Sequence, residues 1–283
     1  MPSNPTIPAT NSDWTALITQ THRTITSLEP VTYTTTTPVS ETIDHTQLSL
    51  TATPEQIDTL CTEARTHNFA TVCVRLRYVA RAVENLHHSA PPQTQTQNLQ
   101  ASSPAKNTPG IACVISFHEG TAPTSSKVTE ALAAVSAGAT ELDMVLNRPL
   151  LQQGEYAAVY EDIQAVRAAI PASVGLKVIL ETGRLGSAEE VVAGSVVACL
   201  AGADYIKTST GFDGPGARVE DVRVMRAVAD ALGTGTKVKA SGGVRSRADW
   251  RRMVEAGAER IGSSSGVRIV VGSGDEKGKV EGY

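Results

Sequence analysis

The sequence predicts an α/β fold of the (β/α)8 TIM-barrel class, as a single domain with a short N-terminal extension. Eight strand-like segments alternate with helical patterns from residue 41 onward, as expected for a chain of βα units. Gly-Ala pairs at 138–139, 202–203 and 257–258 precede three of the strands, where glycine can end a helix in the left-handed conformation. No strand is followed by a GxGxxG fingerprint, which favours the barrel over an open doubly wound sheet.

The predicted strands are short runs rich in aliphatic and β-branched residues. They lie at 42–46, 71–75, 111–116, 141–146, 176–181, 205–210, 237–241 and 260–264. The predicted helices include 54–67, 125–137, 155–169, 187–200, 218–231 and 246–256. The run 266–271 would be a strand by propensity alone, and the local sequence does not decide it.

Three segments lie outside this alternation. Residues 1–40 form a Thr/Ser/Pro-rich extension, in which we expect one short helix over about 13–27, capped by Asp13, with the rest loosely attached. Residues 88–110 form a polar, low-complexity insert that predicts a disordered surface loop. The last residues look flexible, and a terminal Tyr283 would by default be an inert tail residue.

Composition excludes several function classes. The chain has 283 residues, 41% hydrophobic and 19% charged, with a net charge of −4, which gives no general attraction to nucleic acid or anionic membranes. Its four cysteines are widely spaced and form no zinc pattern, so we expect no metal and no structural disulfide. No apolar run is long enough to span a bilayer and no signal sequence is evident. A cytoplasmic protein without a membrane or nucleic-acid partner is therefore expected.

Two lysines lie inside core-like strands, Lys207 in "YIKTST" and Lys239 in "KVKAS". Alternate residues of a barrel strand face the axis, so both lysines should point inward, near Asp143 of the fourth strand. Two neighbouring ammonium groups repel, which lowers the pKa of one of them and provides a neutral amine that can attack a carbonyl group. The alternative is that lysine–carboxylate pairs only neutralise each other, and this stays open above all for Lys177 with Asp143 or Glu181.

A phosphate site is predicted where the seventh and eighth strands end. Ser241-Gly242-Gly243-Val244-Arg245 follows the seventh strand, and Gly262-Ser263-Ser264-Ser265-Gly266 follows the eighth. These loops are common phosphate sites of barrels, because glycines let backbone N–H groups approach the oxygens and serines add donors. Glycines of ordinary tight turns are the alternative.

The segments "ELDMVLN", "LKVILETG", "YIKTSTGF", "KVKASGGVR" and "RIGSSSGV", in this order, closely resemble deoxyribose-phosphate aldolases. "IDHT" and "GEYAAVYEDIQAV" resemble the family as well, so the resemblance runs from about 41 to 272 around the insert. It implies a cofactor-free class I aldolase that interconverts 2-deoxy-D-ribose 5-phosphate with acetaldehyde and D-glyceraldehyde 3-phosphate, in deoxyribonucleoside catabolism.

The resemblance also implies residue roles. Lys207 would form the Schiff base, Lys239 would lower its pKa, and Asp143 would be the acid–base carboxylate. Lys177 and Asp44 would hold this polar network, and Tyr283 could carry protons to the site. The positions that would bind substrate or phosphate are Thr208, Gly211, Gly242, Gly243, Ser264 and Ser265. The sequence leaves the oligomeric state open, with a homodimer as one option.

Two loops depart from the family pattern. Arg75-Leu76 stand where Asn-Pro is usual, and Ser116-Phe117-His118-Glu119 replace a Gly-Phe-Pro-like loop. We expect His118 and Glu119 to be loop residues and not catalysts. The alternatives are a Schiff-base aldolase for another phosphosugar, or a barrel that binds phosphosugars without chemistry.

Overall fold

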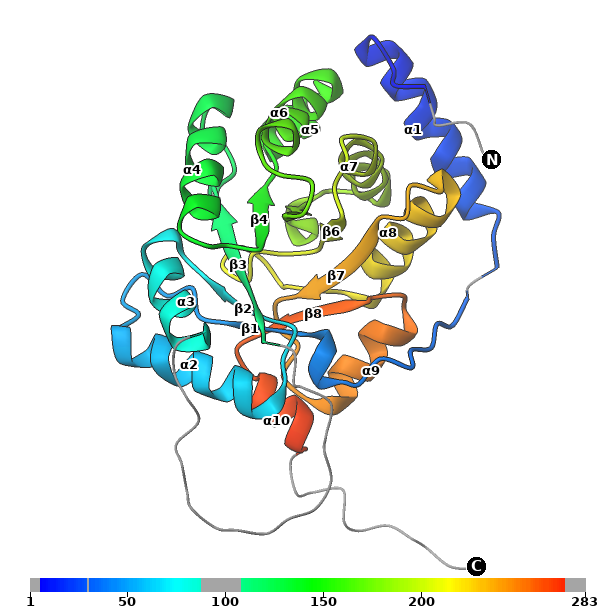
Figure 1. Cartoon of the computed structure of the whole chain (residues 1–283). Coiled ribbons are helices and arrows are strands. Elements are labelled where there is room, and N and C mark those ends of the chain that lie inside the picture. Colours follow the sequence, from blue (N-terminus) through cyan, green and yellow to red (C-terminus); the bar gives the residue numbers. More distant parts are fainter. Residues whose placement is uncertain (1–5, 30, 88–107, 273–283) are drawn as a thin grey trace, which may run out of the picture.

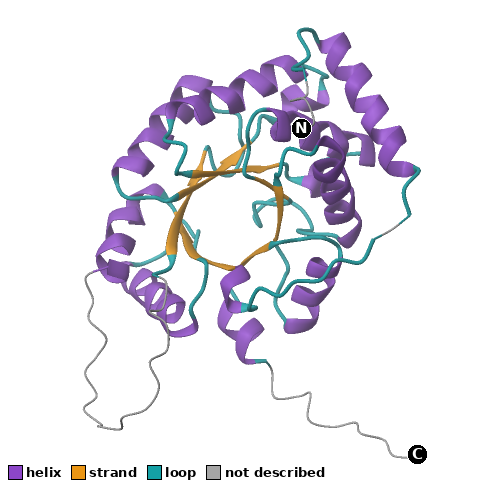
Figure 2. Ribbon diagram, turned by 45° about the vertical axis from the view of Figure 1, so that its right-hand side comes forward, coloured by secondary structure: helices purple, strands orange, loops and turns teal. Residues whose placement is uncertain are grey.

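The computed structural model describes residues 6–29, 31–87 and 108–272. Eight parallel strands close into a barrel, each paired with its neighbour in sequence and β1 paired with β8 (Figure 2). The strands are Ile43–Thr46 (β1), Thr71–Val74 (β2), Gly110–Ile115 (β3), Glu141–Val145 (β4), Gly175–Ile179 (β5), Tyr205–Lys207 (β6), Lys237–Ser241 (β7) and Arg260–Ser263 (β8). The predicted fold class is confirmed.

Helices surround the barrel on its outside (Figures 1 and 2). They are Asn11–Thr26 (α1), Pro54–His67 (α2), Val79–His87 (α3), Thr124–Ser136 (α4), Arg148–Gln152 (α5), Tyr156–Ala169 (α6), Ala188–Leu200 (α7), Val219–Leu232 (α8), Arg247–Glu255 (α9) and Gly266–Val271 (α10). Short 3₁₀ turns occupy Ser40–Thr42, Leu76–Tyr78 and Thr182–Arg184. The run 266–271, which the sequence left undecided, is thus the helix α10. Since β8 already pairs with β1, the closed barrel offers no edge to another strand.

Local signals end the helices as expected. Gly138, Gly202 and Gly257 all have positive φ, from 86° to 110°, directly after α4, α7 and α9. A side chain would be strained in this conformation, which glycine adopts freely. At the other end of a helix, Thr53 and Gln56 form a capping box in front of α2.

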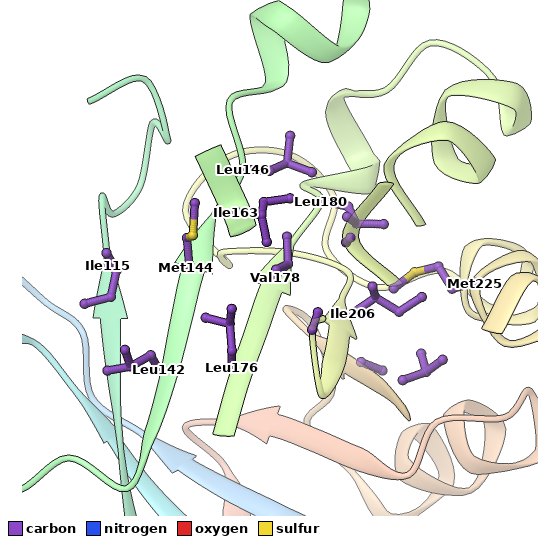
Figure 3. Packing of buried hydrophobic residues seen from close by; sticks show 14 of the residues in the cluster. Ile115, Leu142, Met144, Leu146, Ile163, Leu176, Val178, Leu180, Ile206 and Met225 are labelled. Atoms are coloured by element: carbon purple, nitrogen blue, oxygen red, sulfur yellow. The ribbon is translucent and has the colours of Figure 1, made fainter. Parts of the chain in front are cut away.

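The main apolar core lies between the barrel and the helices. Strand residues that point outward, such as Met144, Val178 and Ile206, pack against side chains of the helix layer, including Ile163 of α6 and Met225 of α8 (Figure 3). All five are fully buried. Alternation along each strand therefore leaves the opposite side chains, such as Asp143 and Lys177, to fill the inside of the barrel.

The N-terminal extension is more firmly attached than the sequence suggested. Helix α1 packs across α7 and α8 (Figure 1) and buries Trp14 completely. Its cap is Thr10, and Asp13 completes the capping box from inside the first turn, because its carboxylate reaches back to the Thr10 backbone. The following segment is tied down by Tyr33, whose hydroxyl donates to Asp230 at 2.8 Å. The predicted insert at 88–110 lies almost wholly outside the described residues, and Gly110 already belongs to β3.

Candidate active site

A pocket of about 320 Å³ opens at the carboxyl ends of the strands. Its walls come from the loops after β1, β6, β7 and β8. The lining residues are Thr46, Gln47, Leu48, Ser49, Lys207, Thr210, Gly211, Phe212, Ser241, Gly242, Gly243, Val244, Arg245, Gly262, Ser263 and Ser264. This is the face on which barrel enzymes carry their active sites.

Lys207 reaches the pocket from the end of β6 and is only 3% exposed. It is the register partner of Lys239 on β7. Asp143 Oδ2 accepts a hydrogen bond from each of the two lysines, at 2.7 Å in both cases, and Asp143 Oδ1 accepts one from Lys177 at 2.8 Å. The strand alternation therefore brings together the lysines and the carboxylate that the sequence predicted.

The three lysines differ in proton affinity. Burial lowers the pKa of Lys207; Asp143 opposes this shift, and Lys239 adds to it. Burial also disfavours the charged forms of Lys177 and Lys239, but Asp143 and further carboxylates raise both pKa values above the usual range. Lys207 is thus the lysine poised to lose its proton. The predicted direction agrees, although burial contributes more than repulsion by Lys239.

Below these groups, the network continues toward the amino ends of the strands. Asp44 lies in ion-pair contact with Lys239, and it accepts a hydrogen bond at 2.7 Å from Arg260, which the sequence analysis did not identify. Glu141 is in ion-pair contact with Lys177 and was missed as well. Both missed residues open their strands at inward positions, two residues before Asp143 or Gly262, so strict alternation would have revealed them.

Glu181 is not a partner of Lys177, contrary to one of the alternatives. It follows β5 with a φ of 54°, which turns its carboxylate toward the loop after β6. There it accepts the backbone N–H of Thr210 at 3.1 Å and the hydroxyl of the same residue. Burial raises the pKa of Glu181.

Four of the six predicted binding residues line the pocket: Gly211, Gly242, Gly243 and Ser264. At Gly242, φ is 83° and a Cβ atom would come within 2.9 Å of the Gly216 Cα, so only glycine lets these loops meet.

Thr208 and Ser265 do not line the pocket. The Thr208 hydroxyl is buried, where it accepts the Ser241 N–H at 3.0 Å and donates to the Ser241 carbonyl at 3.1 Å. Ser265 donates its backbone N–H to Ser263 Oγ at 2.9 Å and occupies the N-cap position of α10 without a side-chain capping bond. Tyr283 lies outside the described residues.

Arg75, at one of the two unusual loops, supports a wall of the pocket. Its Nε donates to the Leu48 carbonyl at 2.8 Å. Its guanidinium carbon lies 5.1 Å from the ring centroid of Phe117 and 5.9 Å from that of Phe212. One side chain thus joins the loops after β1, β3 and β6.

His118 and Glu119 do not line the pocket. Glu119 is exposed and His118 is half-buried, and His118 Nδ1 lies 3.0 Å from a carboxylate oxygen of Glu119. This position fits the expectation that they are loop residues.

The described parts of the chain show no cluster of His, Cys, Asp and Glu that could hold a metal ion. Within the same residues, none of the helices has the length and apolar character that crossing a membrane requires. All four cysteines are free and buried.

Comparison with known proteins agrees with this geometry. The model of the DeoC/LacD family aldolases matches residues 39–272. A deoxyribose-phosphate aldolase of Coccidioides immitis (strain RS) is 53% identical over 232 residues, covering 82% of this chain and 79% of the relative. One of Desulfitobacterium hafniense (strain DSM 10664 / DCB-2) is 45% identical over 229 residues, covering 81% and 95%.

Solved structures show the same relationship. A crystal structure from Coccidioides immitis, provisionally named a deoxyribose-phosphate aldolase, has a TM-score of 0.83 at 48% identity and covers 93% of this chain and 97% of its own. A deoxyribose phosphate aldolase from Aeropyrum pernix, described as a tetramer, has a TM-score of 0.69 at 32% identity, covering 82% and 89%. The chain therefore belongs to the DeoC/LacD family of aldolases.

Proposed function

We propose that the protein is a class I aldolase that cleaves 2-deoxy-D-ribose 5-phosphate to acetaldehyde and D-glyceraldehyde 3-phosphate, and catalyses the reverse addition. The observation that carries this function is Lys207, a buried amine with a lowered pKa that opens into the pocket. The Coccidioides immitis and Desulfitobacterium hafniense relatives of the chain are named deoxyribose-phosphate aldolases, which supports the choice of sugar. The catabolism of deoxyribonucleosides is the corresponding role.

The reaction begins with the neutral amine of Lys207. Its lone pair attacks C1 of the open-chain sugar, a proton moves from nitrogen to oxygen, and loss of water leaves a protonated imine. Asp143 and Lys239 lie beside the amine and supply and accept these protons. The imine cation then serves as the electron sink for the next step.

Bond cleavage requires a base for the C3 hydroxyl proton. Asp143, acting through a water molecule, removes this proton; the C2–C3 electron pair moves into the imine, and glyceraldehyde 3-phosphate leaves. The enamine that remains is protonated at C2, and hydrolysis of the resulting imine releases acetaldehyde and restores Lys207. Lys177 and Asp44 hold Asp143 and Lys239 in place through their ion pairs.

The phosphate end of the substrate would lie at the glycine-rich loops. Gly211, Gly242 and Gly243 expose backbone at the pocket, and the Ser264 hydroxyl is available as a donor. Arg245 lines the same pocket and adds a positive charge there.

Borohydride trapping tests the proposal. Incubation with acetaldehyde and borohydride, followed by peptide mass mapping, should place a stable adduct on Lys207, and Lys207→Met should abolish it. Lys237→Met removes an exposed lysine of the neighbouring strand and should trap normally. An adduct on no lysine would support the non-catalytic barrel instead. A substrate panel separates the remaining alternative, since turnover of another phosphosugar without cleavage of deoxyribose 5-phosphate would overturn the choice of substrate.

We also propose that Tyr283 carries protons to the site. Deleting Tyr283 should then slow turnover more than it weakens inorganic phosphate binding. Unchanged turnover would make it a tail residue.

We also propose a cytoplasmic location, from the composition of the chain, and a homodimer. The tetramer described for the Aeropyrum pernix relative supports self-association. Light scattering of the purified full chain would distinguish monomer, dimer and tetramer, and fractionation of the producing cells would test the location.

A further inference from the structure

A charged network runs through the barrel from the pocket to the opposite end. It contains three carboxylates and four bases, joined by ion pairs from one end to the other. Its members are Asp44, Glu141, Asp143, Lys177, Lys207, Lys239 and Arg260. Lys207 forms the pocket end, and Arg260 forms the end nearest the amino termini of the strands.

Arg260 joins both branches of the network. Its Nη1 lies 2.7 Å from Asp44 Oδ1 and 3.2 Å from Glu141 Oε2, and its Nη2 donates to the Tyr205 hydroxyl at 3.2 Å. Asp44 forms an ion pair with Lys239, and Glu141 forms one with Lys177, so Arg260 is linked to both inner lysines. The side chain of Arg260 is 13% exposed, so water screens these contacts only in part.

The charges of the network do not balance when all seven groups are ionised. Four positive and three negative charges leave an excess of one positive charge in a buried space, which is costly. A single deprotonation removes the excess. Arg260 keeps its proton at any ordinary pH, and the carboxylates hold protons on Lys177 and Lys239. The proton that leaves is therefore the one on Lys207.

We infer that Arg260 is a positioning residue that supplies the fourth positive charge of this network and thereby keeps the amine of Lys207 neutral. This inference rests on the proposed Schiff-base function. Arg260 does so without touching the substrate pocket, by acting through Asp44, Glu141 and the two inner lysines.

The other groups around Lys207 do not provide this charge. Burial raises the pKa of Cys73 on β2 to about 11, so its thiol is neutral. The interior of β3 presents the apolar residues Ala112 and Val114. Glu181, beyond β5, accepts hydrogen bonds from Thr210 outside the network, and burial raises its pKa, which favours its neutral form. The remaining strands present the network residues themselves: Asp44 on β1, Glu141 and Asp143 on β4, Lys177 on β5, Lys239 on β7 and Arg260 on β8, with the phenol of Tyr205 on β6.

The consequence of removing Arg260 has a definite sign. In Arg260→Met, three carboxylates face three lysines, and the network is balanced only when Lys207 keeps its proton. Lys207 should then lose that proton only at higher pH. A rise of one unit in its pKa leaves about tenfold less neutral amine at neutral pH. We expect kcat/KM at pH 7 to fall about tenfold and to recover as the pH is raised.

The experiment measures the rate of borohydride-trapped adduct formation with acetaldehyde between pH 5 and 10, together with kcat/KM, for the full chain and its variants. Arg260→Met should move the midpoint of both profiles upward. Glu141→Gln removes one negative charge and should move the midpoint downward. The double variant R260M/E141Q removes one charge of each sign and should return the midpoint toward that of the unmodified protein.

Two matched variants separate charge from packing. Arg260→Lys keeps the positive charge and should keep the midpoint. Lys237→Met removes a cation from the same end of the barrel, 5.8 Å from the Tyr205 ring, but this lysine faces solvent and should leave the midpoint unchanged.

The outcomes are distinct. An unchanged midpoint in folded Arg260→Met, or a loss of activity that is equal at every pH, overturns the inference. If Arg260→Met does not fold, Glu141→Gln decides it: a downward shift supports the inference and no shift overturns it. Absence of any Lys207 adduct in the unmodified protein would instead overturn the proposed function.

Discussion

The two faces of the barrel sheet have opposite chemistry. On β4 to β7, the outward residues Met144, Val178, Ile206 and Val238 are apolar and pack against the helices. Their inward neighbours along the same strands are the charged network. Both faces are almost completely buried. On these four strands the outward side chains are apolar, and the charged side chains of the network face inward.

The difference shows what makes buried charge tolerable. Asp143 meets three ammonium groups within 2.8 Å, so both of its carboxylate oxygens are satisfied. Ile206 on the outer face, in contrast, belongs to an apolar cluster that includes Met225 of the helix layer (Figure 3). A buried charge is stable in this protein where groups of opposite charge lie within ion-pair distance of it.

Placing a charged side chain on the outer face, or an apolar one on the inner face, should have the largest effect on stability or on turnover. Ile206→Lys places an unpaired ammonium group against the helices, and we expect it to lower the free energy of unfolding by at least about 4 kcal/mol or to prevent folding. Lys207→Met, one residue further, removes a base whose pKa is lowered by burial. It should change the free energy of unfolding by less than about 1 kcal/mol while abolishing turnover. Urea unfolding followed by circular dichroism measures both.

Ile206→Met is the matched control, because it keeps an apolar side chain of similar volume and should cost less than about 1.5 kcal/mol. A stable, folded Ile206→Lys protein would contradict the contrast between the faces. So would a Lys207→Met protein that fails to fold, since the amine would then be a structural group.

The charged inner face should also make the stability of the protein depend on pH below neutrality. Lys239, Arg260 and Lys177 lower the pKa of Asp44 against the effect of its burial, and the three lysines lower that of Asp143. Both carboxylates are therefore ionised in the folded protein at pH values where they are protonated in the unfolded chain. Their contribution to stability is present above about pH 4 and is lost as the pH falls below that value.

Free energies of unfolding measured between pH 3 and 7 should accordingly decrease toward acid, and Asp143→Asn should flatten this decrease. Asp58→Asn removes a half-buried carboxylate whose pKa is lowered by its hydrogen bonds to Arg81 and Asn85. It should flatten the slope less than Asp143→Asn does, because solvent screens this pair. Equal slopes for the two variants would mean that the inner network does not control acid stability.

Strand alternation explains how much of the molecule could be predicted. Period-two spacing places Asp143, Lys207 and Lys239 on one face without any knowledge of the fold beyond a barrel, and the structure brings these three together. The same rule applies to Arg260 and Glu141, since the predicted strands begin at 260 and 141 as they do in the structure, but alternation does not show which inward charges pair across the barrel.

The loops could not be predicted in this way. Thr208 lies next to Lys207 in sequence, yet its hydroxyl bonds to the Ser241 backbone and not to the pocket. The attachment of Tyr33 depends on Asp230, almost two hundred residues away in sequence. Such contacts depend on where a side chain meets a backbone or carboxylate group after folding, which no local pattern contains.

Arg75 follows β2 and supports the wall of the pocket above the charged network. It binds the Leu48 carbonyl and lies over the rings of Phe117 and Phe212. Because Leu48 and Phe212 line the pocket whereas Lys207 is held by Asp143, Arg75→Met should loosen the wall without disturbing the amine. We expect KM for the phosphosugar to rise about fivefold, equivalent to about 1 kcal/mol, with kcat nearly unchanged.

Arg77→Met, which removes a similar bond to Leu50 outside the pocket, should leave both constants unchanged. A fall in kcat for Arg75→Met with unchanged KM would place Arg75 among the groups that control the chemical step, and the wall would then be more than a boundary for the substrate.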